Sequence, residues 1–325
     1  MPARSSPHPR FPLDSGEPMS PDPTAPSAVR RGATSTTTRP AMGGEVVVSS
    51  DASEIAVAAA LTVVATLEAR WSRFRDDSEL SRLNRSDGPA IVRPSTARII
   101  EVALAGRRLT RGWFDPTHGE DLSACGYRRS HDAGWSPPGP LPDRLGDVDL
   151  DPESGLIHVP GGVALDLGGI AKGWAADTAA ALLRRSGATH AGVTVGGDVR
   201  ISADSRALVE VAAPDAVPGP AALVGLRDGG VAVSGPTRRR TADGRHHLID
   251  PRTGRPAATA RVAAVISATA AGAEMLATAA AIAPRAEAEA IVTAAGATAW
   301  LIDDDGTRHR VGEPERFLLD HGWLG

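Results

Sequence analysis

The chain of 325 residues has one cysteine and few aromatic side chains. Cys125 alone cannot form a disulfide within the chain, so a reducing compartment is compatible with the sequence. Only 3% of the residues are aromatic, although 42% are hydrophobic. Alanine, valine and leucine must therefore fill the core of the protein. We expect each aromatic residue either to anchor that core or to contact a ligand.

A large net charge, a membrane-spanning segment and a targeting signal are also lacking. The formal net charge of −4 gives no general attraction to nucleic acid or to anionic membranes. The apolar stretch 57–67 is too short to span a bilayer, and 262–283 is mostly Ala, Ser and Thr. Residues 1–40 carry nine of the 26 prolines and no apolar signal-peptide segment. We expect a disordered tail at 1–40, one domain at 41–325 and a cytoplasmic location.

The spacing of apolar residues predicts a mixture of helices and strands. Helices are expected at 53–74, 94–111, directly after Lys172, at 272–283 and at 285–295. Strands are expected at 41–50, 191–202 (broken by Gly196-Gly197-Asp198), 208–213, 231–234, 246–249, 262–269 and 298–302. On the first two helices, the side chains expected to face inward are Ile55, Ala59, Leu61, Val64, Leu67, Ile99, Val102, Leu104 and Leu109. Because regular βαβ alternation is missing, we predict an α+β fold with antiparallel sheets.

The segment 166–177, D-L-G-G-I-A-K-G-W-A-A-D, has the features of a phosphate site. It follows a strand-like run and leads into an alanine-rich helix. Glycines let backbone N–H groups approach an anion, the helix start adds a partial positive charge, and Lys172 adds a full one. Asp166 could hold a metal or an edge of the ligand. The P-loop and dinucleotide spacings are absent, so a tight turn with a solvated lysine is the alternative.

Four further segments occur in a fixed order around this one: 71–84, 112–117 (G-W-F-D-P-T), 246–256 (H-H-L-I-D-P-R-T-G-R-P) and 270–278 (A-A-G-A-E-M-L-A-T). From about Met42 to the C-terminus, the chain resembles the FAD:protein FMN transferase family, the ApbE-type flavin transferases. The resemblance implies an ApbE-like or T-fold-like single catalytic domain of antiparallel sheets packed with helices. It also implies Mg²⁺-dependent transfer of FMN from FAD to a Thr or Ser hydroxyl of an acceptor protein, with release of AMP. The acceptor is expected to carry a D-x-x-[ST]-G-A-[ST]-like sequence.

Glu274 and Thr278 stand four residues apart on a predicted helix, so they share a face. Carboxylate and hydroxyl oxygens are ligands that Mg²⁺ accepts. The resemblance places the metal pair of the family here, as A-D-x-x-x-T, with the carbonyl of Gly169 as a third ligand. Glu274 departs from that pattern. Its longer side chain keeps the charge and moves the oxygens by about one C–C bond, which bears on metal affinity and choice.

The resemblance also places the reactive histidine of the family at His247. Histidine has an ordinary pKa of about 6.5, which suits proton transfer at neutral pH. A base at this place would take the proton of the acceptor hydroxyl as its oxygen attacks the FMN-side phosphorus of FAD. The implied contacts with FAD are Met42, Phe74, Trp113, Phe114, Asp115, Asp166, Lys172 and Ile249.

Two other functions would use the same residues. If water replaced the acceptor, the site would be an FAD pyrophosphatase that yields FMN and AMP, and the difference would lie in how well the pocket excludes water. Because Glu274 stands where the family has Asp, a flavin-binding protein without turnover is the other alternative. In the turn 250–254, we interpret Arg252 as a structural residue rather than a ligand contact.

Overall fold

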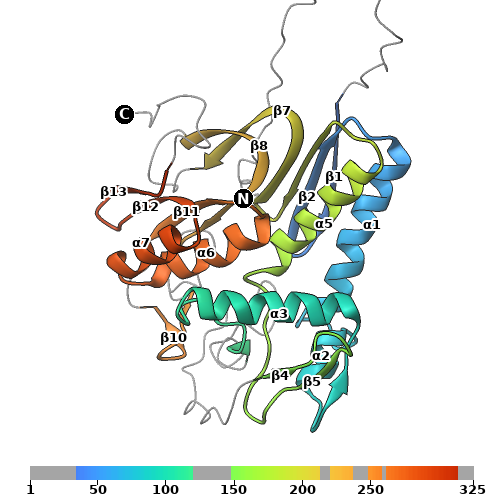
Figure 1. The fold of residues 1–325 in the computed structure, drawn as a ribbon, viewed down its shortest axis with the longest axis vertical. Helices are drawn as coiled ribbons and strands as arrows, with labels where there is room; N and C mark the ends of the chain where they lie inside the picture. Colours follow the sequence, from blue (N-terminus) through green and yellow to red (C-terminus); the bar gives the residue numbers. More distant parts are fainter. Residues whose placement is uncertain (1–33, 120–147, 213–219, 237–247, 258–260, 314–325) are drawn as a thin grey trace, which may run out of the picture.

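The computed structural model describes residues 34–119, 148–212, 220–236, 248–257 and 261–313 (Figure 1). The elements of the first half are β1 Ser35–Ala41, β2 Gly44–Ser50, α1 Glu54–Trp71, α2 Glu79–Asn84, β3 Ala90–Ile91, α3 Pro94–Leu109, β4 Asp149–Leu150, β5 Leu156–His158 and α5 Ala171–Arg185. Those of the second half are β6 His190–Val195, β7 Asp198–Ala212, β8 Pro220–Ser234, β9 Ile249–Asp250, β10 Arg255–Pro256, β11 Val262–Ser267, α6 Ala270–Ile282, α7 Arg285–Ala294, β12 Thr298–Ile302 and β13 Arg308–Val311. Cys125 and the predicted reactive His247 lie outside the described residues.

Most of these strands form one antiparallel sheet of eight strands, in the order β1-β2-β6-β7-β8-β11-β12-β13. Two small antiparallel sheets accompany it, β3-β5-β4 and β10-β9. The predicted α+β class with antiparallel sheets is therefore confirmed. No described helix is both long and apolar enough to cross a membrane.

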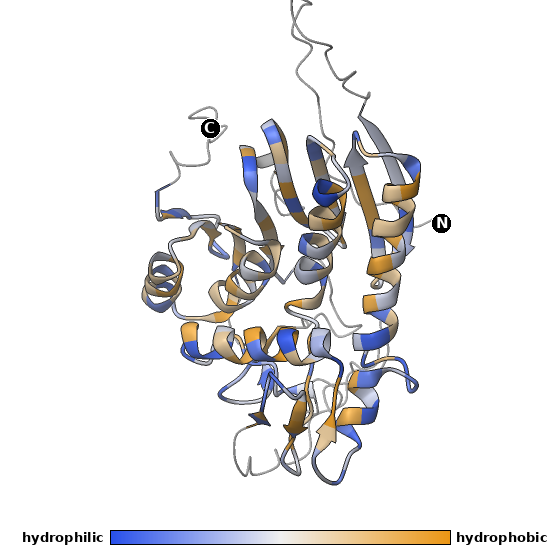
Figure 2. Cartoon of the chain, turned by 45° about the vertical axis from the view of Figure 1, so that its right-hand side comes forward, coloured by the Kyte–Doolittle hydropathy of each residue, from blue (hydrophilic) through white to orange (hydrophobic). Residues whose placement is uncertain are grey.

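Helices α1, α5 and α6 pack together on one face of the large sheet. Figure 1 shows α1 and α5 running side by side, with α3 lying across their ends. The main core lies between this layer and strands such as β6, which contributes Val193 and Val195. The opposite face of the sheet carries a second buried cluster, drawn from β7, β8, β11 and β12 and including Trp300. Figure 2 shows α3 with alternating apolar and polar patches, as an amphipathic helix should have.

The long helices lie where the sequence predicts, although α1 ends at Trp71 instead of residue 74 and α6 begins at Ala270 instead of residue 272. Their inward faces also differ from the prediction. Ser53 accepts a hydrogen bond from the N–H of Ala56 and caps α1, as expected. Ile55 is 83% exposed and Leu109 is 45% exposed, so both are wrongly predicted to face inward. Alanine at many positions makes the apolar stripe hard to distinguish from its surroundings, so the packing of neighbouring elements decides which face is buried.

Two predicted boundaries also need correction. β1 begins at Ser35, inside the stretch predicted to be a disordered tail, and it pairs with β2 from Ser35↔Ser50 to Ala41↔Gly44. The folded domain therefore starts before residue 41. The predicted broken strand 191–202 is a hairpin of β6 and β7, in which Val195 pairs with Asp198 across Gly196 and Gly197. Both glycines have positive φ, 56° and 101°, as a two-residue hairpin turn requires.

Candidate active site

Lys172 lies in the first turn of α5 and bridges two buried carboxylates. Its Nζ donates to Asp198 Oδ2 at 2.7 Å and to Glu274 Oε1. The other Glu274 oxygen accepts the backbone N–H of Gly173 at 2.8 Å. Glu274 is 3% exposed and Asp198 is 5% exposed. The alternative of a solvated lysine is therefore wrong: Lys172 compensates charges inside the protein.

Burial and neighbouring charges set the protonation of this cluster. Burial raises the pKa of Glu274 to about 8; the nearby charge of Asp198 adds to this effect, and Lys172 opposes it. Burial alone would lower the pKa of Lys172, but the charges of Asp198 and Glu274 outweigh it and raise that pKa. The lysine therefore stays protonated, whereas Glu274 holds a proton more readily than an exposed glutamate does.

The residues predicted to bind a metal lie close together. A Cβ atom built on Gly169 would lie 3.6 Å from Thr278 Oγ1 and 3.0 Å from the ring of Phe114. Within the part of the chain that the structure describes, Thr278 Oγ1 makes one long contact of 3.5 Å, with Ser234 Oγ. Glu274 lies one turn earlier on α6. Among the described residues, no group of three or more His, Cys, Asp or Glu could hold a metal. A cation here would therefore depend on hydroxyl and backbone oxygens as well as on one carboxylate.

These donors fit a hard divalent cation. A carboxylate offers about four lone-pair positions, and two N–H donors leave the rest of Glu274 able to accept further contacts. The Thr278 hydroxyl has no short hydrogen bond within the described residues. Together with a backbone carbonyl, these are oxygen ligands of the type that Mg²⁺ binds.

Asp166 and Phe74 are brought together by Arg73. The Arg73 Nε lies 2.7 Å from Asp166 Oδ2, and its guanidinium stacks over the Phe74 ring with 4.2 Å to the centroid. Asp166 Oδ1 also accepts the N–H of Gly168 at 2.5 Å, which orders the Gly-Gly turn. Phe74 is 43% exposed, so its ring remains available to a planar ligand.

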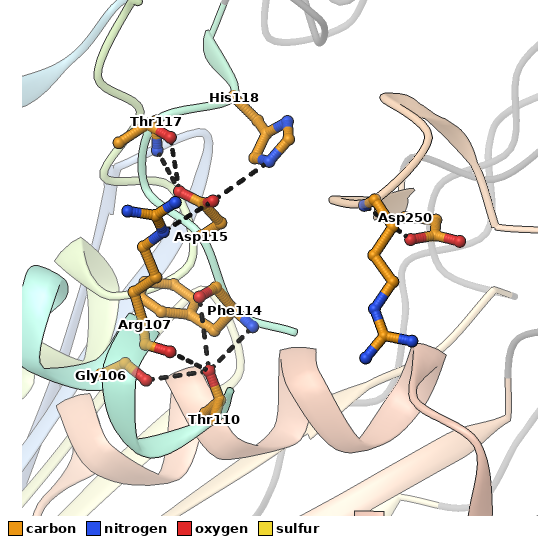
Figure 3. Close-up of polar contacts among 9 residues, drawn as sticks. Gly106, Arg107, Thr110, Phe114, Asp115, Thr117, His118 and Asp250 are labelled. Atoms are coloured by element: carbon orange, nitrogen blue, oxygen red, sulfur yellow. Dashed lines mark hydrogen bonds and ion pairs between the residues drawn. The ribbon is translucent and has the colours of Figure 1, made fainter. Parts of the chain in front are cut away.

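The Asp115 carboxylate is held by a network of side chains from its own loop and from the end of α3 (Figure 3). It accepts hydrogen bonds from Arg107 Nε at 3.0 Å and from the N–H and hydroxyl of Thr117 at 2.9 and 2.6 Å. His118 Nε2 lies 3.3 Å away. Burial would raise the pKa of Asp115, but the hydrogen bonds from His118 and Thr117 outweigh it and hold that pKa below its ordinary value. The carboxylate therefore orders the predicted adenosine-binding loop, and its direct contact with FAD stays a prediction.

Trp113 and Phe114 are buried, at 4% and 3% exposure. The Arg252 guanidinium stacks over the Trp113 ring, 3.8 Å from its centroid. Trp113 Nε1 donates to Glu287 Oε2 at 2.8 Å, and the same carboxylate lies 3.7 Å from Arg252. Arg252 therefore has a packing role through Trp113 and Glu287, and its lack of ligand contact stays a prediction. The stacking contact ties the hairpin that contains Ile249 to the Trp113 loop.

Met42 lies in the turn between β1 and β2, with a φ of 53° and a half-buried side chain packed on the main core. Gly44, two residues later at the start of β2, approaches Gly196: a Cβ on Gly44 would lie 3.3 Å from the Gly196 Cα. Gly196 in turn contacts the side chain of Lys172. The turn that contains Met42 therefore packs against the Gly196 turn, which packs against Lys172 at the centre of the site.

Three residues of this region have structural roles that the sequence does not indicate. Asp198 follows the Gly196-Gly197 pair, whose turn signal the sequence does show. Asn84 exchanges two 2.8 Å hydrogen bonds with the backbone of Leu165, directly before Asp166. Asp177 accepts the first two N–H groups of α6, from Ala270 and Ala271. Short polar side chains of this kind carry no local signal that names a distant backbone partner.

Known proteins share both the sequence pattern and the fold. The profile of the ApbE family matches residues 42–301. An FAD:protein FMN transferase of Treponema pallidum is 33% identical over 242 residues, which is 62% of this chain and 65% of that protein. One from Vibrio cholerae is 29% identical over 223 residues, 58% of this chain and 60% of that protein. The chain thus spans less than two thirds of the length of these curated relatives.

Solved structures agree with the family profile. The crystal structure of the ApbE protein of Thermotoga maritima gives a TM-score of 0.78 at 27% identity, covering 86% of this chain and 97% of that one. The flavin transferase ApbE from Vibrio cholerae gives 0.71 at 22% identity, covering 88% and 99%, which bears on the fold alone. Since the profile extends over most of the sequence and the fold agrees, this chain belongs to the ApbE family.

Proposed function

We propose that this protein transfers FMN from FAD to a Thr or Ser hydroxyl of an acceptor protein and releases AMP, with Mg²⁺ as its cofactor. The observation that carries the proposal is the partly buried Lys172 at the start of α5, next to the Gly168-Gly169 turn. It is paired with Glu274, which lies one turn of α6 before Thr278. Family membership supports the same reaction, because the curated relatives bear the name FAD:protein FMN transferase.

In this proposal, the diphosphate of FAD lies at the N-terminal end of α5. The helix dipole favours an anion there, and Lys172 supplies a full positive charge. Phe74 offers an exposed ring on which the flavin can stack. The loop ordered by Asp115 would receive the adenosine part.

Mg²⁺ would be held by the Thr278 hydroxyl, the Glu274 carboxylate and the Gly169 carbonyl. When bound, it would neutralise charge on the phosphate oxygens. The donor set described above supports this assignment, because all three groups are hard oxygen ligands on neighbouring segments.

The proposed reaction is a displacement at phosphorus. The acceptor hydroxyl oxygen forms a bond to the FMN-side phosphorus, the phosphoanhydride bond breaks, and AMP leaves with the electron pair. The hydroxyl proton passes to His247, which is the predicted base and lies outside the described residues. Lys172 remains charged throughout and stabilises the negative charge that develops on the phosphate oxygens.

One incubation tests the proposal. The protein is mixed with FAD, Mg²⁺ and a domain carrying D-x-x-T-G-A-T, and flavin fluorescence of the acceptor on a denaturing gel is read together with AMP release. A fluorescent acceptor with matching AMP is the expected result, and an acceptor whose threonine is changed to alanine should stay dark.

The same incubation separates the competing functions. AMP and free FMN without labelling would overturn the transferase in favour of an FAD pyrophosphatase. Bound FAD with neither product would overturn both enzymes in favour of a flavin-binding protein without turnover. Chelation of Mg²⁺ with EDTA should stop labelling, and undiminished labelling would contradict the metal assignment.

A further inference from the structure

The turn between β6 and β7 contacts the outer half of the Lys172 side chain. A Cβ on Gly196 would lie 3.0 Å from the Cδ and 3.7 Å from the Cε of Lys172, so the bare backbone of Gly196 packs against the lysine methylenes. Two residues later, Asp198 Oδ2 accepts the ammonium at 2.7 Å. A side chain at Gly196 would press on these methylenes, and its φ of 56° also favours glycine.

The two carboxylates that meet Lys172 are not equivalent. Glu274 has a second hydrogen-bond donor, the N–H of Gly173, and it is also the proposed metal ligand. Asp198 begins β7, where strand pairing with Val195 fixes its backbone, and its side chain is 7% exposed. A rigid, buried carboxylate of this kind can hold a lysine in one place, whereas Glu274 has other contacts to make.

We infer that Gly196 and Asp198 form a cradle for Lys172, and that Asp198 is the positioning residue that holds this lysine against the substrate diphosphate. The inference rests on the proposed function. An ammonium group has three N–H donors. In the present structure Asp198 and Glu274 each take one. When FAD and Mg²⁺ are bound, Lys172 keeps its hydrogen bond to Asp198. The N–H group that it now donates to Glu274 is donated to a phosphate oxygen instead.

A double-mutant cycle on FAD affinity tests this inference. Asp198→Asn, Lys172→Met and the double variant are titrated with FAD in Mg²⁺, and binding is read from flavin fluorescence. Each single change should weaken binding by about tenfold, since coupled charge pairs contribute in this range. In the Lys172→Met background, Asp198→Asn should have no further effect, because Asp198 acts only through the lysine.

Asp204→Asn provides the matched control. Asp204 also lies on β7 and pairs with an arginine, Arg184, but its side chain is 61% exposed. Its removal should leave FAD affinity unchanged. Equal losses for Asp198→Asn in both backgrounds, or no loss in either, would overturn the inference.

Thermal unfolding without ligand gives a second, independent answer. Lys172→Met leaves two buried carboxylates without their cation, so the unfolding temperature should fall. Adding Asp198→Asn removes one of those carboxylates and should recover part of the loss, whereas a further fall would contradict the cradle. If the native protein bound FAD but labelled no acceptor, the proposed transferase activity would be wrong. The cradle would still be tested by the FAD titrations and by the thermal unfolding of the same variants.

Discussion

At the scale of single residues, the site is organised by buried charge. Lys172 is surrounded by Asp198 and Glu274, and buried charges persist only when they are paired and hydrogen-bonded. The longer arm of Glu274 is used in this arrangement, because its two oxygens reach the ammonium and the N–H of Gly173 at once. Glu274, which stands where the family pattern has aspartate, therefore has its own hydrogen-bond partner in this protein, the N–H of Gly173.

Removing Glu274 or Thr278 tests the metal assignment. We expect Glu274→Ala and Thr278→Ala each to weaken Mg²⁺ binding to the FAD-loaded protein by about tenfold or more, since even residues that only support metal ligands matter at this level. Titration calorimetry measures the affinity. Glu289→Ala is the control, because Glu289 lies on α7 and is 43% exposed. Unaltered Mg²⁺ affinity in both site variants would rule the assignment out.

Asp115 should make the free energy of unfolding depend on pH in the acidic range. Its folded pKa lies below its ordinary value, so the ionised form stabilises the fold. This contribution is complete above the unfolded pKa of about 4 and is lost as pH falls through the lower folded pKa. Asp115→Asn should therefore reduce the free energy of unfolding at pH 7 and reduce it less as the pH falls below about 4. Denaturant unfolding of both proteins across this range measures the difference; a constant gap would contradict the prediction.

At the scale of elements, the distance between α5 and α6 positions the site. Gly173 on α5 packs directly on the start of α6: a Cβ there would lie 2.4 Å from the carbonyl carbon of Ala270. Asp177, one turn further along α5, accepts the N–H groups of Ala270 and Ala271 at 2.9 and 3.0 Å. These two contacts place Glu274 and Lys172, which lie on different helices, within hydrogen-bonding reach.

Gly173→Ala should force these helices apart. Because the new methyl group would overlap backbone atoms, which cannot move like a flexible side chain, we expect a loss of about 1–3 kcal/mol in the free energy of unfolding. Gly88→Ala is the control, since a Cβ there meets nothing within 4 Å. Denaturant unfolding of both variants checks this, and equal stability of the two would contradict the close packing of α5 on α6.

Asp177→Ala should weaken the start of α6 in a similar way. It removes the acceptor of two backbone N–H groups, a change that costs about 0.5–2 kcal/mol when it occurs at helix caps. Asp177→Asn keeps one carbonyl acceptor and should lose less. Hydrogen exchange of the first turn of α6 would show faster exchange in the alanine variant; identical protection in all three proteins would argue against the capping role.

At the scale of the whole molecule, segments far apart in sequence meet around Trp113. The hairpin of β9 and β10 reaches it through Arg252, and α7 reaches it through Glu287. The link between Trp113 and Glu287 spans 174 residues of sequence. The part of the hairpin that follows His247 is thereby fixed against the loop predicted to bind adenosine.

Arg252→Ala should loosen this attachment. The variant loses the stack on Trp113 and the contact with Glu287, so amide exchange over 248–257 should accelerate while β6 in the large sheet stays protected. Arg255→Ala is the matched control, because Arg255 is an exposed arginine of the same hairpin. Acceleration by both variants alike would mean that the Trp113 contact is not what holds the hairpin.

Local signals in the sequence were sufficient for much of the fold. Ser53 marks the start of α1, and the Gly196-Gly197 pair marks a turn, because caps and turns depend on a few adjacent residues. The inward faces of alanine-rich helices were less certain, as Ile55 and Leu109 show. Alanine packs wherever a neighbouring element lies, so this choice needed the positions of those elements.

The sequence by itself determined the family motifs, the antiparallel α+β class and the candidate residues Gly169, Lys172, Glu274 and Thr278. Only the tertiary structure decided how their charges are compensated. Lys172 meets Asp198 across 26 residues and Glu274 across 102. Hydrogen bonds and ion pairs act over a few ångströms in space, whatever the separation along the chain. Partners contributed by α5, α6 and β7 therefore become recognisable only when the sheet and helices have brought them together.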